Sequence, residues 1–407
     1  MKKKTVESEV LIVGAGFIGK VMALMLASLN ISVFLVDKKK IKVNDNRTTA
    51  ITQGSSRILK KIGIWNKIDE SCEGIEKIFV ANKNSEDYLV FDSSKLNEGD
   101  LGFIIENKIF KNMLDQEILK NTNINTDDNC EISTLKTENN TNNYQDKIYA
   151  ESKKTRFITD LLIAADGRNS SIRDMAKFKF FAKKYNQCAY VFNITHEEKH
   201  KNIALERFFA EGPLALLPMK TEKNKKNINR SSVVWTLDSR LGDFTKLKKK
   251  EFFIEFSRRY EDFFGRLLSV SNPVVYPLNL IYTFNVAKNK IIFVGDSAQG
   301  IHPIAGQGFN LGLRDCETLC NLIFKFKSSG AKLNSPILFQ KYCEQRFVDR
   351  NLFIQATDKL NQIFSNDVKP ILLFREIGLN LINKSPLIKK QLMINAMGLK
   401  QNFLSLF

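Results

Sequence analysis

The stretch Val10-Leu11-Ile12-Val13-Gly14-Ala15-Gly16-Phe17-Ile18-Gly19 decides the fold of this chain. Its first four residues are apolar and predict a buried strand, and its glycines predict a tight turn directly after that strand. The residues that follow predict a helix over Val21–Leu29 and a second buried strand over Ile31–Val36. Strand, turn, helix and strand in this order form one βαβ unit, so we expect an α/β fold with parallel strands.

The glycine spacing in this turn is typical of a site that binds a dinucleotide. Gly14 permits the tight turn, Gly16 lets a pyrophosphate approach the backbone, and Gly19 lets helix and strand pack closely. Unpaired backbone N–H groups at the start of the helix then bind the phosphates. Asp37 ends the second strand, 18 residues after Gly19, where a carboxylate accepts hydrogen bonds from ribose hydroxyls. These features predict a dinucleotide but do not separate FAD from NAD.

A second glycine-rich turn lies far along the chain, after a buried strand that we predict over Ile291–Val294. Asp296 follows that strand, where its carboxylate suits the hydroxyls of a ribityl chain. Four glycines then occur in the thirteen residues Gly300–Gly312, before a helix that we expect from about Leu311. Backbone N–H groups beside a helix N-terminus suit a phosphate or the electron-rich edge of a flavin.

A third motif and the remaining segments complete the pattern. The motif Ala164–Arg173 contains the turn Asp166-Gly167, directly after a strand predicted over Phe157–Ala165. Residues 121–157 are rich in polar side chains and predict a weakly structured hairpin and loop. Residues 185–280 alternate short apolar and polar segments, which predicts a mixed sheet, and residues 331–407 are mostly helical in pattern.

The composition narrows the class of protein. The chain carries 62 Lys and Arg against 44 Asp and Glu, which gives a net charge of +18. The Lys runs are scattered and no aromatic–basic module is present, so we expect a basic surface without a nucleic-acid partner. The six cysteines have no metal-type spacing, and we expect no metal site. The lack of a secretory signal and of a run of about 18 apolar residues favours the cytoplasm.

The three motifs in this order resemble those of the aromatic-hydroxylase group of flavoprotein monooxygenases. Within that group the chain is similar to the ubiquinone-biosynthesis hydroxylases, the family of 2-octaprenyl-6-methoxyphenol hydroxylase. Gln299 supports the narrower match, because many aromatic hydroxylases outside the ubiquinone group have His there. Asp37 stands where the family more often has Glu, which also bonds ribose. The segments that carry the match are Arg47–Ala50, Gly54–Leu59, Gly63–Trp65, Glu206–Phe208, Glu211–Pro218 and His302–Asp315.

This resemblance covers nearly the whole chain, apart from residues 121–157 and 220–230, and it implies FAD as the bound cofactor. The implied contacts to FAD come from all three motifs and from one further arginine. They are Gly14, Gly16, Gly19 and Asp37 for the ADP half; Asp296 for the ribityl–pyrophosphate region; Pro303, Gly308 and Asn310, with Gly306 in the same turn, for the flavin ring; Arg47 as a support; and Asp166 with Gly167 for FAD and NAD(P)H together.

The family's reaction follows from the same resemblance. NAD(P)H reduces the flavin, O₂ adds to give a flavin hydroperoxide, and its distal oxygen attacks an electron-rich phenol ring. The flavin carries the difficult chemistry, while the protein positions the ring and excludes water. The resemblance therefore implies ring hydroxylation of a polyprenylated phenol on the way to ubiquinone. The pattern identifies no protein acid or base.

We expect an α/β fold with a Rossmann-like FAD-binding domain, a mixed-sheet substrate domain and a helical C-terminal region. The FAD-binding domain is predicted to be discontinuous. Its predicted segments are 1–75, 100–180 and 285–330, with the substrate domain at 76–99 and 181–284 and the helical region at 331–407. The helical tail from Leu372 to Met397 either packs on its own protein or lies on a membrane surface, on the inner face of the membrane, or docks on a ubiquinone-biosynthesis complex.

Three rival functions stay open: a hydroxylase for a small soluble phenolic acid, a flavin-dependent dehydrogenase or reductase, and a non-catalytic assembly subunit.

Two histidine features also need interpretation. His196-Glu197-Glu198-Lys199-His200 matches the zinc-protease pattern H-E-x-x-H, but its charged, strand-following context predicts a solvated loop instead. His302, next to Pro303 in the second turn, suits a structural or cofactor-orienting role at least as well as that of a base.

Overall fold

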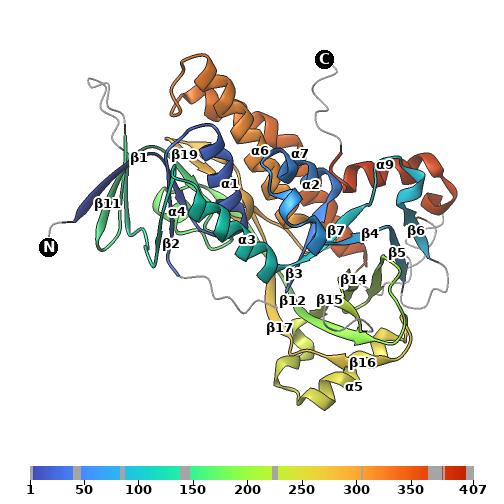
Figure 1. Cartoon of the computed structure of the whole chain (residues 1–407). Helices are drawn as coiled ribbons and strands as arrows, with labels where there is room; N and C mark the ends of the chain where they lie inside the picture. Colours follow the sequence, from blue (N-terminus) through green and yellow to red (C-terminus); the bar gives the residue numbers. More distant parts are fainter. Residues whose placement is uncertain are drawn as a thin grey trace.

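The computed structural model describes residues 3–39, 47–82, 88–137, 147–221, 228–303, 306–364, 378 and 381–399. In this part of the chain the strands form an eight-stranded, a nine-stranded and a three-stranded sheet. Figure 1 shows the eight-stranded sheet on the left and the nine-stranded sheet at the lower right, with the helices α6 (Gln307–Ser328) and α7 (Pro336–Phe364) along the upper side. The expected α/β class, with a Rossmann-like sheet, a mixed sheet and C-terminal helices, is confirmed.

The eight-stranded sheet contains the βαβ unit predicted from the first motif. The strand β1 is parallel to β11 on one side and to β2 on the other. The helices α1 and α3 pack against each other beside it. The main path of this sheet, in spatial order, is β18 (Ala287–Lys288), β19 (Ile291–Phe293), β11 (Thr155–Ala164), β1 (Lys4–Val13), β2 (Val33–Asp37) and β8 (Ile124–Asp128), with β10 (Ile148–Glu151) and β9 (Thr134–Thr137) beside β11; the helices are α1 (Phe17–Ser28), α3 (Asn107–Lys120) and the short α4 (Ser171–Met175).

The nine-stranded sheet is antiparallel except where β13 and β5 run parallel. Its order is β20 (Gln299–Gly300), β17 (Val274–Thr283), β12 (Phe180–His196), β15 (Asn229–Asp238), β14 (Gly212–Met219), β13 (Ile203–Phe209), β5 (Lys77–Asn82) and β6 (Leu89–Asp92), with β16 (Leu267–Val270) beside β12. One face is closed by α5 (Lys249–Tyr260), whose Phe252 and Phe256 pack on Phe192 and Trp235.

A small third sheet and two further helices connect these parts. The sheet has the order β3 (Thr48–Thr52), β7 (Gly102–Glu106) and β4 (Glu73–Ile75), and it lies against β14. The helix α2 (Gln53–Lys61) follows β3, and the C-terminal helix α9 (Pro386–Ala396) ends against it, where Gly54 N–H donates to Met397 O. The tail is thereby tied back to the cofactor side of the molecule.

The helix α2 ends at Lys61, because Gly63 adopts a positive φ of 70° and stops it. Two local predictions need correction. The segment 121–157 contains the predicted hairpin, formed by β9 and β10, but it is more ordered than its polar composition suggested, since β8 extends the parallel sheet; residues 138–146 lie outside the described part. His196 is not in a solvated loop but is buried at the end of β12, between Glu198 O and Ser231 Oγ.

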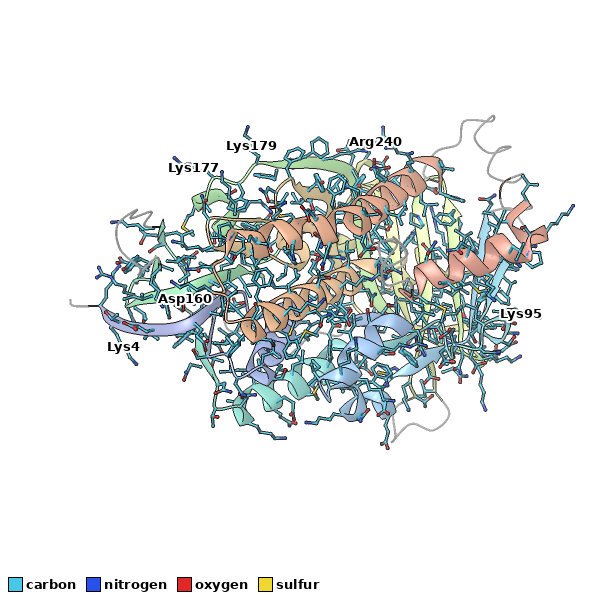
Figure 2. The ribbon with its side chains drawn as sticks, turned by 90° about the horizontal axis from the view of Figure 1, so that it is seen from above. Lys4, Lys95, Asp160, Lys177, Lys179 and Arg240 are labelled. Carbon is cyan, nitrogen blue, oxygen red and sulfur yellow. The ribbon has the colours of Figure 1, made fainter. Side chains whose placement is uncertain are left out.

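The basic surface charge is dispersed, as the scattered lysines predicted. Lys4, Lys95 and Arg240 lie at separate points on the periphery of the molecule, and Lys177 and Lys179 lie together at another (Figure 2). Among the described residues, no helix is long and apolar enough to cross a membrane, and no group of three or more His, Cys, Asp and Glu side chains could hold a metal ion.

Candidate cofactor and active site

The first glycine turn lies between β1 and α1, and its glycines differ in what surrounds them. A Cβ on Gly14 would lie 2.3 Å from Ala165 O, and one on Gly19 would lie 1.8 Å from Gly14 O. These two positions are therefore closed to any side chain. A Cβ on Gly16, which caps α1, would meet nothing within 4 Å. Gly16 thus borders open space at a helix N-terminus, the place where a pyrophosphate binds.

Asp37 stands at the end of β2, beside this turn. Its Oδ2 accepts a hydrogen bond of 2.7 Å from Ala15 N, and its Oδ1 accepts one of 3.0 Å from Lys39 N. These bonds hold the carboxylate next to the glycine turn, although its side chain is only half-buried. Each oxygen has a second lone pair, so the geometry is compatible with the predicted bonds to ribose hydroxyls.

The second glycine turn lies against the first, although almost 300 residues separate them along the chain. Ile18 of the first turn packs between Gly295 and Gly312: their added Cβ atoms would approach its side chain to 3.2 and 2.7 Å. The third motif joins them, because Gly14 abuts Ala165. All three motifs are therefore assembled at the carboxyl ends of β1, β11 and β19, the edge where parallel sheets bind ligands.

Arg168 orients Asp296 within this assembly. Its Nε donates to Asp296 Oδ2 at 2.9 Å, and its other nitrogens donate to Ile301 O at 2.8 Å and to Asn279 O at 3.1 Å. Asp296 remains partly exposed, and its other oxygen lies near Gly308 at the start of α6. Arg168 lies within the third motif, but no role was predicted for it. The neighbouring Asp-Gly turn was the signal that could have indicated one.

Asp166 and Gly167 occupy the turn after β11 in different environments. Burial raises the pKa of Asp166, against hydrogen bonds such as the one that Ile172 N donates to its Oδ2. Its buried Oδ1 has no partner among the described residues. Gly167 has a φ of 83° and open space where a Cβ would stand. An orphaned carboxylate oxygen beside open backbone is a place where a bound hydroxyl or amide donor fits.

Asn310 is buried and uses its amide to tie α6 to β3. Its Oδ1 accepts from Thr52 N at 2.9 Å, and its Nδ2 donates to Ala50 O at 2.9 Å and to Gly306 O at 3.1 Å. These bonds position the turn at Gly306, which is in the left-handed conformation at the start of α6. They make Asn310 a positioning residue; that it also lines the flavin ring stays a prediction.

The other predicted residues lie around the same turn. Arg47 packs its guanidinium over the ring of Tyr276, 5.1 Å from the centroid. Pro303 O accepts a hydrogen bond of 2.9 Å from Gly306 N, and residues 304 and 305 lie outside the described residues. His302 is fully buried, with Nε2 3.3 Å from Gln187 Oε1. Burial and the charge of Arg168 lower the pKa of His302 to about 4, so the imidazole is neutral at neutral pH.

A buried ion-pair network supports the second turn from behind, and sequence reasoning missed it. Asp315 Oδ2 accepts from Gly295 N at 2.9 Å and from Gln299 Nε2 at 2.6 Å, while its Oδ1 accepts from Arg346 Nε at 2.6 Å. Arg350 extends the network to Gln299 Oε1 at 2.6 Å. The available signal was the spacing of the two arginines, four residues apart on one face of a helix.

One face of the nine-stranded sheet is turned toward the glycine turns. Strand register places Gln187, Ser232 and Tyr276 on this face, and each contacts the cofactor side, at His302, Thr48 and Arg47 respectively. Across the centre of the face runs one row of register-paired residues, which we call the cofactor-facing row. Its members are Glu206, Ala215, Val234 and Val191.

The side chains of this row are more exposed to solvent than expected for the centre of a sheet that packs on both faces. Glu206, Val234 and Val191 are partly exposed, whereas Leu205, Val233 and Phe192, which point to the opposite face, are buried under α5 and its neighbours. Central residues of a sheet that packs on both faces would be buried on both. The front of the sheet thus leaves room between itself and the cofactor turns, as a ligand-binding wall requires.

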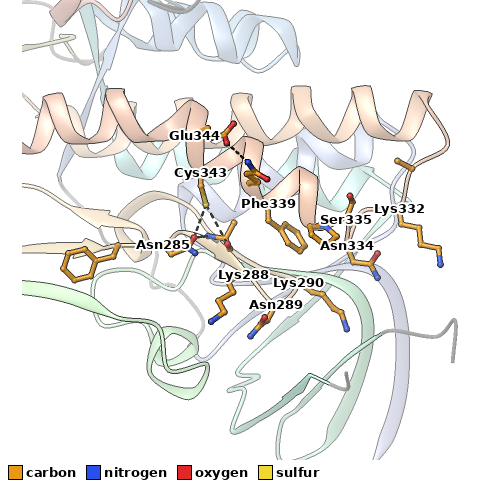
Figure 3. A pocket seen from close by; sticks show the side chains of 15 residues that line it. Asn285, Lys288, Asn289, Lys290, Lys332, Asn334, Ser335, Phe339, Cys343 and Glu344 are labelled. Carbon is orange, nitrogen blue, oxygen red and sulfur yellow. Dashed lines mark hydrogen bonds between the residues drawn. The ribbon is translucent and has the colours of Figure 1, made fainter. Parts of the chain in front are cut away.

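A cavity of about 950 Å³ lies elsewhere and does not belong to this site. It is lined by Lys288, Asn289 and Lys290 of the β18–β19 hairpin, by Lys332 of the connection from α6 to α7 and by Phe339 of α7 (Figure 3). The hairpin precedes β19, whereas the Gly295 turn follows it, so the cavity is at the other end of the strand. Ligands of parallel sheets bind at the carboxyl ends, and we do not assign the cofactor here.

The residues present fit FAD. Open backbone at Gly16 suits the pyrophosphate, Asp37 suits the ribose, and Asp296 with the start of α6 suits the ribityl chain and the flavin end. These individual assignments stay predictions. Because all three motifs meet at one edge of the sheet, a single extended cofactor can contact them together.

Comparisons with known proteins agree with this geometry. A family model described as FAD binding domain matches residues 7–342. The ubiquinone hydroxylase UbiL of Rhodospirillum rubrum is 30% identical over 96% of this chain and 90% of its own length. The 3-demethoxyubiquinol 3-hydroxylase of Escherichia coli is 25% identical over 96% of this chain and 99% of its own length. The described resemblance to flavoprotein monooxygenases is therefore confirmed.

A solved structure shows the same fold. The p-nitrophenol 4-monooxygenase PnpA of Pseudomonas putida superposes with a TM-score of 0.80 at 14% identity, over 97% of this chain and 98% of that one. Its likeness at this identity concerns the fold alone. Together with the family model and the relatives, it accounts for the whole described architecture. The chain belongs to the FAD-dependent monooxygenase family that includes the ubiquinone hydroxylases, and it is a flavoprotein aromatic monooxygenase that uses FAD, with NAD(P)H as the reductant typical of its class.

Proposed function

We propose that the chain hydroxylates the aromatic ring of a polyprenylated phenol in ubiquinone biosynthesis, with O₂ and NAD(P)H as co-substrates. The similarity over nearly full length to UbiL and to the 3-demethoxyubiquinol 3-hydroxylase supports this substrate class. The observation that carries the proposal is the cofactor-facing row, which presents Ala215, Val234 and Val191 to the glycine turns. An apolar wall suits a prenylated ring.

The same wall disfavours the rival that acts on a small phenolic acid. Such a substrate needs a cation for its carboxylate, but the charged member of the cofactor-facing row is Glu206, an acid. Two like charges in a partly buried place repel each other and raise the cost of binding. A neutral phenol with an apolar chain avoids this repulsion.

FAD, held by the three motifs, would supply the redox chemistry, that is, hydride acceptance and transfer of one oxygen atom of O₂. The chain's own residues hold and orient the reactants. The network around Asp315 and the bonds of Asn310 fix the second turn, and Arg168 fixes Asp296. The buried His302 and the apolar row keep water from the ring, which limits wasteful reactions of the reduced cofactor.

The proposal predicts coupled oxygen consumption and hydroxylation. Purified protein with FAD, NAD(P)H and a phenol carrying an ortho prenyl chain is expected to consume O₂ and form one hydroxylated product per O₂. An oxygen electrode and mass spectrometry of the product measure this, with 4-hydroxybenzoate as the matched substrate lacking a chain. NAD(P)H oxidation without any hydroxylated product would favour a dehydrogenase or reductase.

In cells from which the gene is deleted, a prenylphenol lacking one hydroxyl group is expected to accumulate. A normal level of ubiquinone in these cells would contradict a role in the pathway.

We also propose that α9 brings the enzyme to the surface of an anionic membrane, where such substrates reside. Met393 faces the protein and is buried, but Leu387 is 81% exposed and Ile388 is 50% exposed, beside Lys384 and Lys390. Exposed apolar side chains with neighbouring lysines are typical of helices that lie on anionic lipid.

The double substitution Leu387→Glu with Ile388→Glu is therefore expected to abolish flotation with phosphatidylglycerol vesicles. Turnover of a short-chain, water-soluble prenylphenol should be unchanged, since neither residue contacts the site. Substitution of Leu241, an exposed leucine in the 3₁₀ turn that follows β15, by Glu is the control and should leave flotation intact. Equal flotation of all three proteins would contradict the membrane proposal.

A further inference from the structure

Glu206 is the ionisable residue of the cofactor-facing row. It lies in the middle of β13, in register with Ala215 of β14 on one side and with Val80 of β5 on the other. Phe208, two residues along on the same face, stacks on Phe364 of α7 with ring centroids 3.9 Å apart. This contact shows that the face carrying Glu206 is the one turned inward, toward α7 and the cofactor side.

The carboxylate of Glu206 is unpaired within the described part of the chain: no described residue donates a hydrogen bond to it or forms an ion pair with it. Its chain neighbour Arg207 points to the opposite face, where it contacts Glu261 and bonds Tyr88 Oη at 2.8 Å. Burial alone raises the pKa of Glu206 to about 7.

Among the described residues, the side chains that flank Glu206 on its face of the sheet carry no charge. The flanking strands put Val80 and Ala215 beside it, and the inward-facing residues of the last turns of α7 are Thr357, Asn361 and Phe364, none of which ionises. Asp358 of α7 is paired with Lys183 at 2.8 Å.

An unpaired carboxylate in a half-buried apolar wall destabilises the folded protein. Buried polar groups in native structures normally have hydrogen-bond partners, and exceptions often mark functional groups. Glu206 is nevertheless not sealed, since it is partly exposed on the side of the sheet that faces the cofactor turns. A ligand that enters from that side and brings one hydrogen-bond donor satisfies it.

We propose that Glu206 is a catalytic residue that binds the phenolic hydroxyl group of the substrate through a hydrogen bond accepted by its ionised carboxylate. This inference rests on the proposed function, and it names the polar contact that orients the ring. The hydroxyl donates, the carboxylate oxygen accepts, and the electron density of the ring rises. A more electron-rich ring is a better nucleophile toward the oxygen atom that is transferred. The apolar neighbours hold the rest of the substrate.

The substitution Glu206→Gln tests this contact with little change in shape. It is expected to lower kcat/KM for a 2-prenylphenol on the order of 100-fold, as loss of a proton-accepting group in a reacting site does. In the wild type, kcat/KM should rise about tenfold per pH unit below pH 7 and level off above it, because one group must lose its proton. The profile of Glu206→Gln should be flat there, and Glu206→Asp should keep a pH-dependent profile at reduced activity.

Two further measurements separate a catalytic role from a structural one. FAD content and the rate of flavin reduction by NAD(P)H without phenol should be the same in wild type and Glu206→Gln. Because the pKa of Glu206 is raised in the folded state, the folded protein becomes less stable as the pH rises from the ordinary pKa of 4.5 to about 7. The Tm of Glu206→Gln should therefore exceed that of the wild type at about pH 8.5, and the two should be nearly equal at about pH 4, where Glu206 is largely protonated in both the folded and the unfolded state.

Glu198→Gln is the control variant, because Glu198 is an exposed acid beyond the end of β12; it should match the wild type throughout. An unchanged pH profile and kcat/KM in Glu206→Gln would overturn the inference while leaving the proposed function in place. If the wild type hydroxylates no prenylphenol, the proposed function fails. A titration with 2-prenylphenol, monitored by the absorbance of the flavin, then tests whether Glu206 binds the phenolic hydroxyl group. Tight binding above pH 7 that is lost in Glu206→Gln supports the contact, and equal binding overturns it.

Discussion

Replacement of Gly16 by valine is expected to abolish FAD binding while the apoprotein stays folded. A side chain at this position meets no protein atom within 4 Å, and the backbone φ of −67° is one that any residue adopts. The valine side chain would instead fill the space that the pyrophosphate needs, next to the unpaired N–H groups of α1. Loss of two charge-assisted hydrogen bonds, each worth about 1.5–3 kcal/mol, weakens binding by roughly 100-fold or more.

The measurement is the dissociation constant of FAD by fluorescence titration of the apoprotein, together with the Tm of the apoprotein. Gly16→Val should lower the Tm of the apoprotein only modestly, since valine is a poorer N-cap than glycine by roughly 1 kcal/mol. Gly19→Ala is the contrasting variant: its Cβ would lie 1.8 Å from Gly14 O, so the apoprotein itself should unfold at a lower temperature. Wild-type FAD affinity in Gly16→Val would show that the pyrophosphate binds elsewhere.

Replacement of Asp315 by alanine is expected to lower the free energy of unfolding by about 3–5 kcal/mol, because it leaves a buried cation without its partner. Arg346 would lose its 2.6 Å bond, and Gly295 N and Gln299 Nε2 would lose their acceptor. Since Gly295 begins the turn that carries Asp296, the variant should also retain less FAD. Urea unfolding followed by circular dichroism measures the first effect, and the flavin absorbance per chain measures the second.

The control for this prediction is an ion pair on the surface. Arg240 pairs with Asp238, but its side chain is 85% exposed, so Arg240→Ala should leave the urea midpoint of unfolding close to that of the wild type. If Asp315→Ala is as stable as Arg240→Ala, the network around Asp315 does not support the second turn. The comparison also tests whether burial, rather than charge pairing as such, sets the size of the effect.

The sequence alone identified the parts of the site that depend on backbone geometry. The glycines at 14, 16 and 19 could be recognised because their spacing is a local pattern, and the βαβ unit around them has a distinct periodicity. The strand ending before Asp296 was readable for the same reason. Polar composition misled for residues 121–157, because β8 takes its stability from pairing with β2, not from its own residues.

Only the tertiary structure could show which distant residues meet. The packing of Ile18 on Gly295 and Gly312, the network joining Asp315 to Arg346, and the place of Glu206 in an apolar row all join segments far apart in the chain. Local periodicity carries no information about such pairings, since it reports which face of an element is buried but not what covers it. The sequence thus determined the class of cofactor, a dinucleotide. The arrangement of charged residues around the glycine turns was decided by how the two large sheets and α7 pack.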